Sequence, residues 1–453
     1  MSTSTLLLLL TGLSLVAYYL GIRRSLLVAG AGGRRALNSL PVHYGMLAAL
    51  WCLLPALVVV LLWTAFQESV ITRLLVAALP PEQAVLNPAE LTLVINDIKN
   101  LAVGNIVSGL ETPALRAAAD HYLHLRSVSR AALVVIATVL AMLGTAVVWR
   151  RISTQMLARN HVESIVKILL ILSSALAIVT TVGIVLSVLF ESIRFFELVP
   201  LTEFLFGLHW SPQGSPGAFG AVPLFAGTLL ISAIAMLVAV PIGLMSAIYL
   251  SEYAARRVRA VAKPLLEVLA GIPTVVYGVF AALTLAPLVR AAGAHLGLEV
   301  ASESALVAGL VMGIMIIPFV SSLSDDFINA VPQSLRDGSY ALGSTRSEAI
   351  KQVVIPAALP GIVGGILLAA SRAIGETMIV VLAAGLAANL TANPLEAVTT
   401  VTVQIVTLLV GDQEFDSAKT LAAFALGLVL FVATLILNVI ALHVVRKYRE
   451  QYE

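Results

Sequence analysis

Residues 223–250 read PLFAGTLLISAIAMLVAVPIGLMSAIYL, an unbroken apolar run that contains no charged side chain. A helix needs about 20 such residues to cross a hydrocarbon core roughly 30 Å thick. The run lacks the apolar–polar alternation of a barrel strand, so a helix is the expected way for it to satisfy its backbone in lipid. This stretch therefore predicts that the chain crosses a membrane as an α-helix.

Eight further stretches are long and apolar enough to cross in the same way. With the first, they are residues 5–22, 45–66, 131–149, 166–190, 223–250, 264–289, 304–322, 358–386 and 419–445. The sequence therefore predicts an all-α polytopic membrane protein of about nine transmembrane helices, three N-terminal helices being followed by a six-helix core.

The composition of the 453 residues excludes several other classes of protein. Charged residues are 11% and hydrophobic residues 59%, against roughly 25% and about 45–50% in ordinary soluble domains. This excludes a soluble cytosolic enzyme and a disordered chain. The formal net charge of +2 argues against nucleic-acid binding, which needs a strong basic excess. The single cysteine, Cys52, excludes a disulfide framework.

The distribution of Lys and Arg predicts the orientation of the chain. With the N-terminus placed outside, 18 of the 27 basic residues fall on inner segments, as the positive-inside rule requires. We expect a multi-pass protein of a bacterial inner membrane, with a periplasmic N-terminus and a cytoplasmic C-terminus. The first apolar stretch is followed by Arg23 and Arg24, which favours an uncleaved anchor over a secretory signal.

The chain divides near residue 164. Residues 1–164 hold three predicted helices and a long external segment, about 67–130, and residues 165–453 form a unit with both ends inside. Within the external segment, Asn87-Pro88-Ala89-Glu90 and Thr112-Pro113 are typical helix starts. An apolar stripe follows the first start at helical spacing: Leu91, Val94, Ile95, Ile98, Leu101, Ala102 and Ile106. The stripe could contact a partner or pack on the protein's own helices, and we favour the second.

The sequence shows no pattern for covalent chemistry. None of the six lysines follows a glycine, so the phosphate-binding loop G-x-x-x-x-G-K-[ST] is missing. No pair of histidines has metal-ligand spacing. We therefore expect a chain that is not an enzyme and holds no cofactor or metal.

Arg372 and Glu376 are the candidate functional pair. Counting from Gly361 at about 1.5 Å per residue places Arg372 around 16 Å into its helix, where a charge should face the protein interior or a water-filled path. Glu376, four residues on, would lie on the same face and could pair with it. Arg372 could meet an anion in transit, because a guanidinium donates two parallel hydrogen bonds to an oxyanion. The alternative is a structural ion pair that locks two helices.

The inner segment of about residues 324–360 predicts two short helices. Residues 335–342 form one, ended by Gly343, which tolerates a left-handed turn. Thr345-Arg346-Ser347-Glu348 is a capping box that opens the next, and Pro356 is expected to close it. Such a rigid bend could transmit force from a soluble partner, or it could be an ordinary amphipathic connector.

This segment resembles the loop by which permeases of ATP-binding cassette (ABC) importers contact their ATPases. Its pattern is Asp337-Gly338-Ser339-x-x-x-Gly343, nine residues, then Val353-x-Ile355-Pro356. The family has Glu-Ala-Ala at the first three positions, whereas the glycine, the spacing and the proline agree. The resemblance implies that the ATPase-coupling residues are Asp337, Gly338, Ser339, Ala341, Leu342, Gly343, Thr345, Ile355 and Pro356.

Three further segments, residues 270–278, 341–345 and 371–377, are similar to the phosphate permeases of this family. The tail 426–431 with Asn438 is more similar to the PstC type than to the sister PstA type, and residues 18–25 resemble the N-terminal region of a long PstC variant. The resemblance covers about Val166 to the C-terminus and implies a substrate path with Arg372, Glu376 and Thr377. It implies four kinds of partner: a PstA-like second permease subunit, two PstB-like ATPase subunits that bind the ATP, a PstS-like periplasmic phosphate-binding protein, and the lipid bilayer.

Three alternatives remain open at this point. A permease of the same class could carry another oxyanion, such as sulfate or molybdate, and binding assays with the cognate periplasmic protein would distinguish it. An ion-coupled secondary transporter would move substrate without an ATPase, but the few intramembrane charges make a poor proton relay. The first 164 residues or so could also serve as a structural or sensory subunit.

Overall fold

The computed structural model describes residues 3–79, 88–104, 112–214, 217–411 and 417–449. Within these residues, nine helices are long and apolar enough to cross a membrane. The only strands there form a two-stranded antiparallel ribbon that pairs Trp210 with Phe219 and Ser211 with Ala218. The prediction of an all-α polytopic membrane protein is confirmed.

The chain separates into two compact units, Met1–Ile178 and Val179–Glu453. The division falls inside one long helix, α6 (Ala158–Leu198), whereas the sequence placed a boundary near residue 164. Ala158 and Val162 at the start of α6 are buried in the core of the first unit. The first turns of this helix therefore belong to the first unit by packing.

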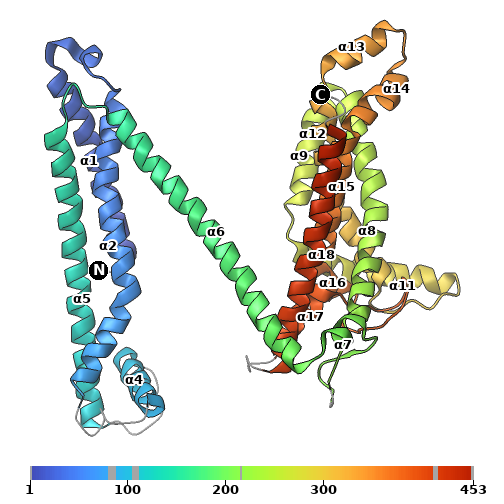
Figure 1. Ribbon diagram of the computed structural model, residues 1–453, viewed down its shortest axis with the longest axis horizontal. Helices are drawn as coiled ribbons and strands as arrows, with labels where there is room; N and C mark the ends of the chain where they lie inside the picture. Colours follow the sequence, from blue (N-terminus) through green and yellow to red (C-terminus); the bar gives the residue numbers. More distant parts are fainter. Residues whose placement is uncertain (1–2, 80–87, 105–111, 215–216, 412–416, 450–453) are drawn as a thin grey trace. The chain divides into compact units, whose positions relative to one another are not determined.

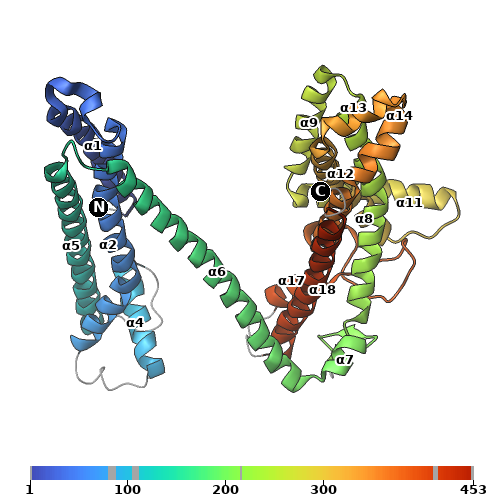
Figure 2. The ribbon, with the colours of Figure 1, turned by 45° about the horizontal axis from the view of Figure 1, so that its top comes forward.

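The first unit is built on three long helices that run side by side (Figures 1 and 2). They are α1 (Thr3–Ala29), α2 (Pro41–Ala77) and α5 (Pro113–Arg151), with a short 3₁₀ helix, η1 (Gly30–Ala36), after α1. At Gly144 of α5, an added Cβ would lie 2.1 Å from the carbonyl oxygen of Trp51 on α2. Only glycine permits this approach, so small residues let these helices pack closely.

The external segment folds back onto its own unit. Helix α4 (Pro88–Val103) carries the predicted apolar stripe. Ile98 is fully buried against Ile71 and Leu75 of α2 and Tyr122 of α5, and Leu91, Val94, Leu101 and Ala102 pack around them. The favoured interpretation is confirmed for these residues. Thr112 caps α5 as predicted, its hydroxyl accepting a hydrogen bond from Leu115 N at 3.2 Å, whereas Asn87 and Ile106 lie outside the described residues.

The second unit places α12 (Ala305–Ala330) at its centre, with more than half of that span buried. Helices α8 (Val222–Ile248), α15 (Ile355–Ile374) and α18 (Ala418–Arg449) accompany it (Figure 1). The remaining elements are α7 (Leu201–Phe206), β1 (Trp210–Ser211), β2 (Ala218–Phe219), η2 (Tyr249–Tyr253), α9 (Arg256–Ala270), α10 (Thr274–Phe280), η3 (Ala281–Leu285), α11 (Ala286–His295), α13 (Gln333–Ala341), α14 (Arg346–Ala349), η4 (Ile350–Val354), α16 (Met378–Ala383) and α17 (Val401–Gly411).

The sixth predicted span, 264–289, begins later than expected. Helix α9 ends at Ala270, and the membrane-length helix starts at Thr274 and runs to His295. Pro273 disfavours helical backbone at the residue before it, which explains the break. Helix α9, all of it described, has no buried residue and begins with Arg256, Arg257 and Arg259, so it is an amphipathic surface helix and not part of a span.

Candidate functional site

The predicted span 358–386 is broken next to its charged residues. Helix α15 ends at Ile374, and the short helix α16 begins at Met378. Arg372 therefore lies in the last turn of α15, and Gly375, Glu376 and Thr377 form the bend. The placement of Arg372 in the middle of a continuous helix is wrong. A broken helix leaves polar backbone groups free, which is tolerated at membrane depth only against protein or a water-filled cavity.

The guanidinium of Arg372 has no anionic partner within the described residues. The guanidinium lies over the ring of Phe319 of α12, whose centroid lies 5.7 Å from Cζ. The side chain is exposed on this isolated chain. A cation in the last turn of a helix is favoured by the helix dipole, but this leaves the hydrogen-bond donors of the guanidinium available.

Glu376 does not pair with Arg372, contrary to the sequence-based expectation. Its Oε1 accepts hydrogen bonds from the backbone amides of Met378 at 3.1 Å and Ile379 at 3.5 Å. The i, i+4 geometry is lost because the helix has already ended. The carboxylate instead holds the first turn of α16, where the free amides favour a negative charge.

Thr377 is half-buried at the start of α16. The bend beside it is anchored from α17, because the Thr402 hydroxyl donates to the carbonyl oxygen of Glu376 at 2.9 Å. Further along, Gln404 accepts from Trp210 Nε1 at 3.0 Å and donates to the carbonyl oxygen of Leu386 at 3.2 Å. These buried polar contacts fix the irregular backbone after α16. The sequence analysis missed Thr402 and Gln404.

A cavity of about 230 Å³ lies between α9 and α12, and Phe319 is part of its wall. The guanidinium of Arg372 lies over the face of the same ring. Polar side chains line the cavity as well: Lys263, Glu267, Ser321, Ser322 and Asp325. The unpaired guanidinium and this partly polar cavity therefore share one aromatic wall.

Asp325 is the centre of a charged cluster that the sequence analysis missed. Its side chain is 3% exposed and accepts hydrogen bonds from Arg259 Nη2 at 3.0 Å and from Lys263 Nζ at 2.9 Å. The bond to Asp325 raises the pKa of Lys263 above its usual value. Arg259 and Lys263 stand four residues apart, so one helix face presents both cations to Asp325. That spacing, together with an aspartate inside the apolar helix α12, was the available signal.

A second ion pair ties α13 to the rest of the unit. Arg336 Nη1 donates to Glu252, and Nη2 donates to the carbonyl oxygen of Ile328 at 2.6 Å. Both side chains are largely buried, at 13% and 7% exposure. A buried arginine that is paired with a carboxylate and bonded to a carbonyl oxygen is held in one conformation. The pair therefore connects η2, the end of α12 and α13.

The two predicted short helices of the inner segment are present as α13 and α14, side by side at one end of the unit (Figures 1 and 2). Gly343 has φ +90°, and its amide donates to the carbonyl oxygen of Tyr340, so the left-handed turn is confirmed. The capping box of Thr345 and Glu348 is also confirmed.

Pro356 does not close the second helix, so that expectation is wrong. Helix α14 continues through the π-helical turn η4 into α15, and the whole helix runs from Arg346 to Ile374. The wider turn accounts for this, because the Ile355 amide bonds to the carbonyl oxygen of Ile350 and the ring of Pro356 has no amide to satisfy.

The remaining coupling residues form an exposed tip. Leu342 is 90% exposed, and Ala341, Gly343 and Thr345 are exposed beside it. Asp337 is exposed and accepts from Gln333 Nε2 at 3.0 Å, and Gly338 is in the helix with open space around it. Ser339 is buried beneath the tip, and Ile355 and Pro356 are half-buried. Leu342 therefore projects from the end of the tip.

Comparison with known proteins gives two family matches on this chain. Residues 6–180 match a family described as "Phosphate ATP-binding cassette transporter". Residues 239–450 match the "Binding-protein-dependent transport system inner membrane component" family. The first match covers the first unit, and the second covers Arg372 and the whole inner segment.

Curated relatives agree with these matches. The "Probable ABC transporter permease protein YqgH" of Bacillus subtilis is 35% identical over 51% of this chain and 73% of its own length. The PstC permease of Mesorhizobium japonicum is 35% identical over 53% and 76%, and that of Haemophilus influenzae is 31% identical over 64% and 96%. The chain therefore belongs to the binding-protein-dependent inner membrane components, and among them to the PstC family of phosphate transport system permease proteins.

Proposed function

We propose that this chain is the permease subunit that forms half of the path of an ATP-driven phosphate importer, and that Arg372 meets the phosphate in that path. The observation that carries the proposal is the unpaired guanidinium of Arg372 beside a helix break. A charge in a membrane-spanning unit is costly unless it faces protein or water. An anion in transit gives Arg372 the partner that its own chain does not provide.

The chemistry of Arg372 suits phosphate. A guanidinium presents parallel N–H donors at a spacing that matches two oxygens of a tetrahedral oxyanion. Phe319 supports the flat face of the group from α12 and leaves its edge free. The cavity of about 230 Å³ between α9 and α12, which shares the Phe319 wall and has Lys263 in its lining, would receive the anion next.

Glu376 and Thr377 have supporting roles in this proposal. Glu376 acts as a positioning residue, because its carboxylate holds α16 and with it the bend beside Arg372. Thr377 contributes a hydroxyl close to the same bend. Since Arg372 is exposed on this chain, a PstA-like second permease subunit would cover it and complete the walls of the path.

Coupling to ATP would occur at the α13–α14 tip. Leu342 is almost fully exposed there, and the buried Glu252–Arg336 pair connects the tip to α12. In the proposed complex, two PstB-like ATPase subunits bind the ATP and receive the tips of the two permease chains. This chain itself would bind no nucleotide and no cofactor.

The distribution of basic residues supports an orientation in a bacterial inner membrane. By the positive-inside rule, the α13–α14 tip and the C-terminus would lie in the cytoplasm, and the N-terminus and α4 in the periplasm. A PstS-like periplasmic protein would deliver phosphate on the side of α4. Selection of phosphate over sulfate or molybdate would then reside largely in that partner.

The test is uptake of radiolabelled phosphate by the complete importer in proteoliposomes, with Arg372→Gln in this chain. We expect uptake to fall on the order of 100-fold, because two charge-assisted hydrogen bonds are lost. Arg290→Gln, which removes another exposed arginine of the same unit, is the matched control and should transport normally. Normal phosphate uptake by Arg372→Gln would contradict the proposal. Uptake of sulfate or molybdate instead of phosphate by the wild-type importer would show that the substrate is one of those oxyanions.

A further inference from the structure

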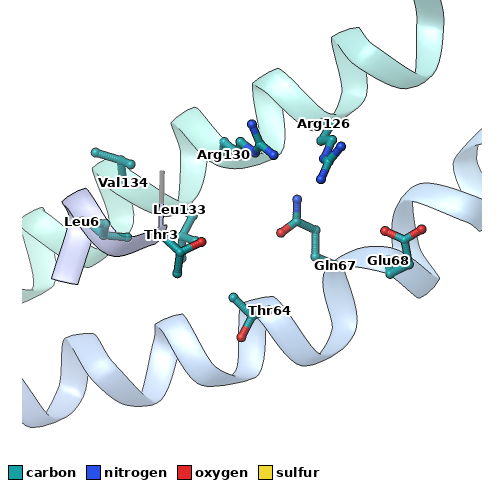
Figure 3. A pocket seen from close by; sticks show the side chains of 9 residues that line it. All are labelled: Thr3, Leu6, Thr64, Gln67, Glu68, Arg126, Arg130, Leu133 and Val134. Atoms are coloured by element: carbon teal, nitrogen blue, oxygen red, sulfur yellow. The ribbon is translucent and has the colours of Figure 1, made fainter. Parts of the chain in front are cut away.

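The first unit contains a polar pocket that the transport path does not use. It has a volume of about 310 Å³ and lies where α1, α2 and α5 meet. Its lining combines Thr3, Leu6, Thr64, Gln67, Glu68, Arg126, Arg130, Leu133 and Val134, drawn in Figure 3. The volume is within the range of small-molecule sites.

Two arginines of α5 reach into this pocket. Arg126 and Arg130 are four residues apart, so they lie on one helix face. Figure 3 shows both side chains turned toward the space between α5 and α2, where the Gln67 amide points at them. The two guanidinium groups and the amide thus face a common point from opposite helices.

Neither arginine is neutralised within the part of the chain that the structure describes. Glu68 is the only acidic residue in the lining, and its Oε1 is 2.6 Å from Lys99 Nζ of α4. Lys99 therefore takes the one carboxylate that could have balanced the pair. Two like charges one helical turn apart repel each other, so an anion bound between them would stabilise the unit.

The helix segment that carries the two arginines is tied to α2. Trp63 Nε1 of α2 donates to Ser129 Oγ of α5 at 3.0 Å, which fixes the register of the two helices beside the pocket. Leu6 and Leu133, both almost fully buried, form an apolar floor. Two guanidinium groups beside an apolar floor offer a ligand both a charged and an apolar surface.

We propose that this pocket binds a phosphoryl oxyanion through Arg126 and Arg130. Tetrahedral phosphoryl oxygens match two guanidinium forks, and the Gln67 amide can donate a further hydrogen bond. Inorganic phosphate and the phosphate of an anionic phospholipid headgroup both present this chemistry. The inference does not depend on the role proposed for Arg372.

The test compares two full chains that both carry Arg372→Gln, so that the transport path cannot contribute. One keeps Arg126 and Arg130 and serves as the reference, and the other is the double variant Arg126→Gln/Arg130→Gln. In one arm, equilibrium dialysis measures the binding of radiolabelled inorganic phosphate to detergent-purified chain. In the other, native mass spectrometry counts phosphatidylglycerol retained by chain from nanodiscs of that lipid. Arg150→Gln, an exposed arginine near the other end of α5, is the matched control.

We expect the double variant to bind at least about tenfold more weakly in one arm, since each lost charge-assisted hydrogen bond is worth at least that factor. Loss in the dialysis arm identifies inorganic phosphate as the ligand, and loss in the lipid arm alone identifies a headgroup. Equal binding by wild type, double variant and control in both arms would overturn the proposal. Arg126→Lys/Arg130→Lys keeps the charge without the fork, and intermediate binding by this variant excludes a folding defect as the cause.

Discussion

Arg336 and Arg372 lie in the same unit and have opposite surroundings. Arg336 is largely buried and bonded to Glu252 and to the carbonyl oxygen of Ile328. Arg372 is exposed, lies over the Phe319 ring, and makes no ion pair or side-chain hydrogen bond within the described residues. Since a buried charge is stable only when its donors are satisfied, the first arginine holds the structure and the second is free to meet a ligand. The difference predicts which variants lose stability and which lose transport.

The largest stability effect should come from Glu252→Gln. Removing the carboxylate leaves the buried Arg336 without its counter-charge, and breaking such a pair costs about 3 kcal/mol in the free energy of unfolding. The measurement is thermal or denaturant unfolding of the purified chain, with Glu267→Gln, an exposed glutamate of α9, as the control. Arg372→Gln should change the free energy of unfolding by well under 1 kcal/mol. An equal loss in Glu252→Gln and Arg372→Gln would remove the distinction.

Asp325→Asn should have the next largest effect. Asp325 is buried, but Arg259 and Lys263 are about one-third exposed and can turn toward water. We therefore expect a loss of about 2 kcal/mol, less than at Glu252. Unfolding measured at neutral pH checks this value. A larger loss in Asp325→Asn than in Glu252→Gln would contradict the ranking.

The same contact predicts a dependence on alkaline pH. Asp325 raises the pKa of Lys263 from its ordinary 10.5, so the folded state binds this proton more tightly than the unfolded state. The resulting stabilisation is complete below pH 10.5 and is lost as the pH rises through the raised pKa. Unfolding of the wild type and of Asp325→Asn between pH 9 and 12 tests this, and parallel curves for the two proteins would contradict it.

A matched pair of glycines in the coupling tip should give the smallest effects, of opposite sign. Gly343 has φ +90°, where an alanine costs about 1–2 kcal/mol. Gly338 is inside α13 with open space around it, where an alanine gains about 0.5–1 kcal/mol of helix stability. Hydrogen exchange of the α13–α14 segment should show protection falling in Gly343→Ala and rising in Gly338→Ala. The same change in both variants would contradict this account of the tip.

The sequence predicted the parts of the fold that depend on apolar length and on local caps. The membrane helices, the Thr112 cap, the Thr345–Glu348 capping box and the left-handed Gly343 all follow from short-range rules. The breaks at Pro273 and Gly375 were missed, because an apolar count does not register a bend between two apolar segments. Pro356 was read as a helix end because the π-turn that accommodates it has no sequence signature.

The candidate site was predicted less completely than the fold. The sequence located Arg372 and its chemistry, because an arginine within an apolar stretch is conspicuous. The predicted pairing of Glu376 with Arg372 was wrong, because that pairing depends on where the helix ends. The ion pairs of Asp325 with Arg259 and Lys263, and of Arg336 with Glu252, join residues at least 60 positions apart, and no local pattern reports such pairs.

The central claim is that Arg372 faces a water-filled path in the assembled importer and not lipid. The direct measurement is labelling of an Arg372→Cys variant in the complete complex, since the natural Cys52 is buried and can be replaced by serine. We predict rapid reaction with a membrane-impermeant, water-soluble thiol reagent in at least one nucleotide state of the ATPases. Reaction only with a lipid-soluble reagent, in every nucleotide state, would contradict the account.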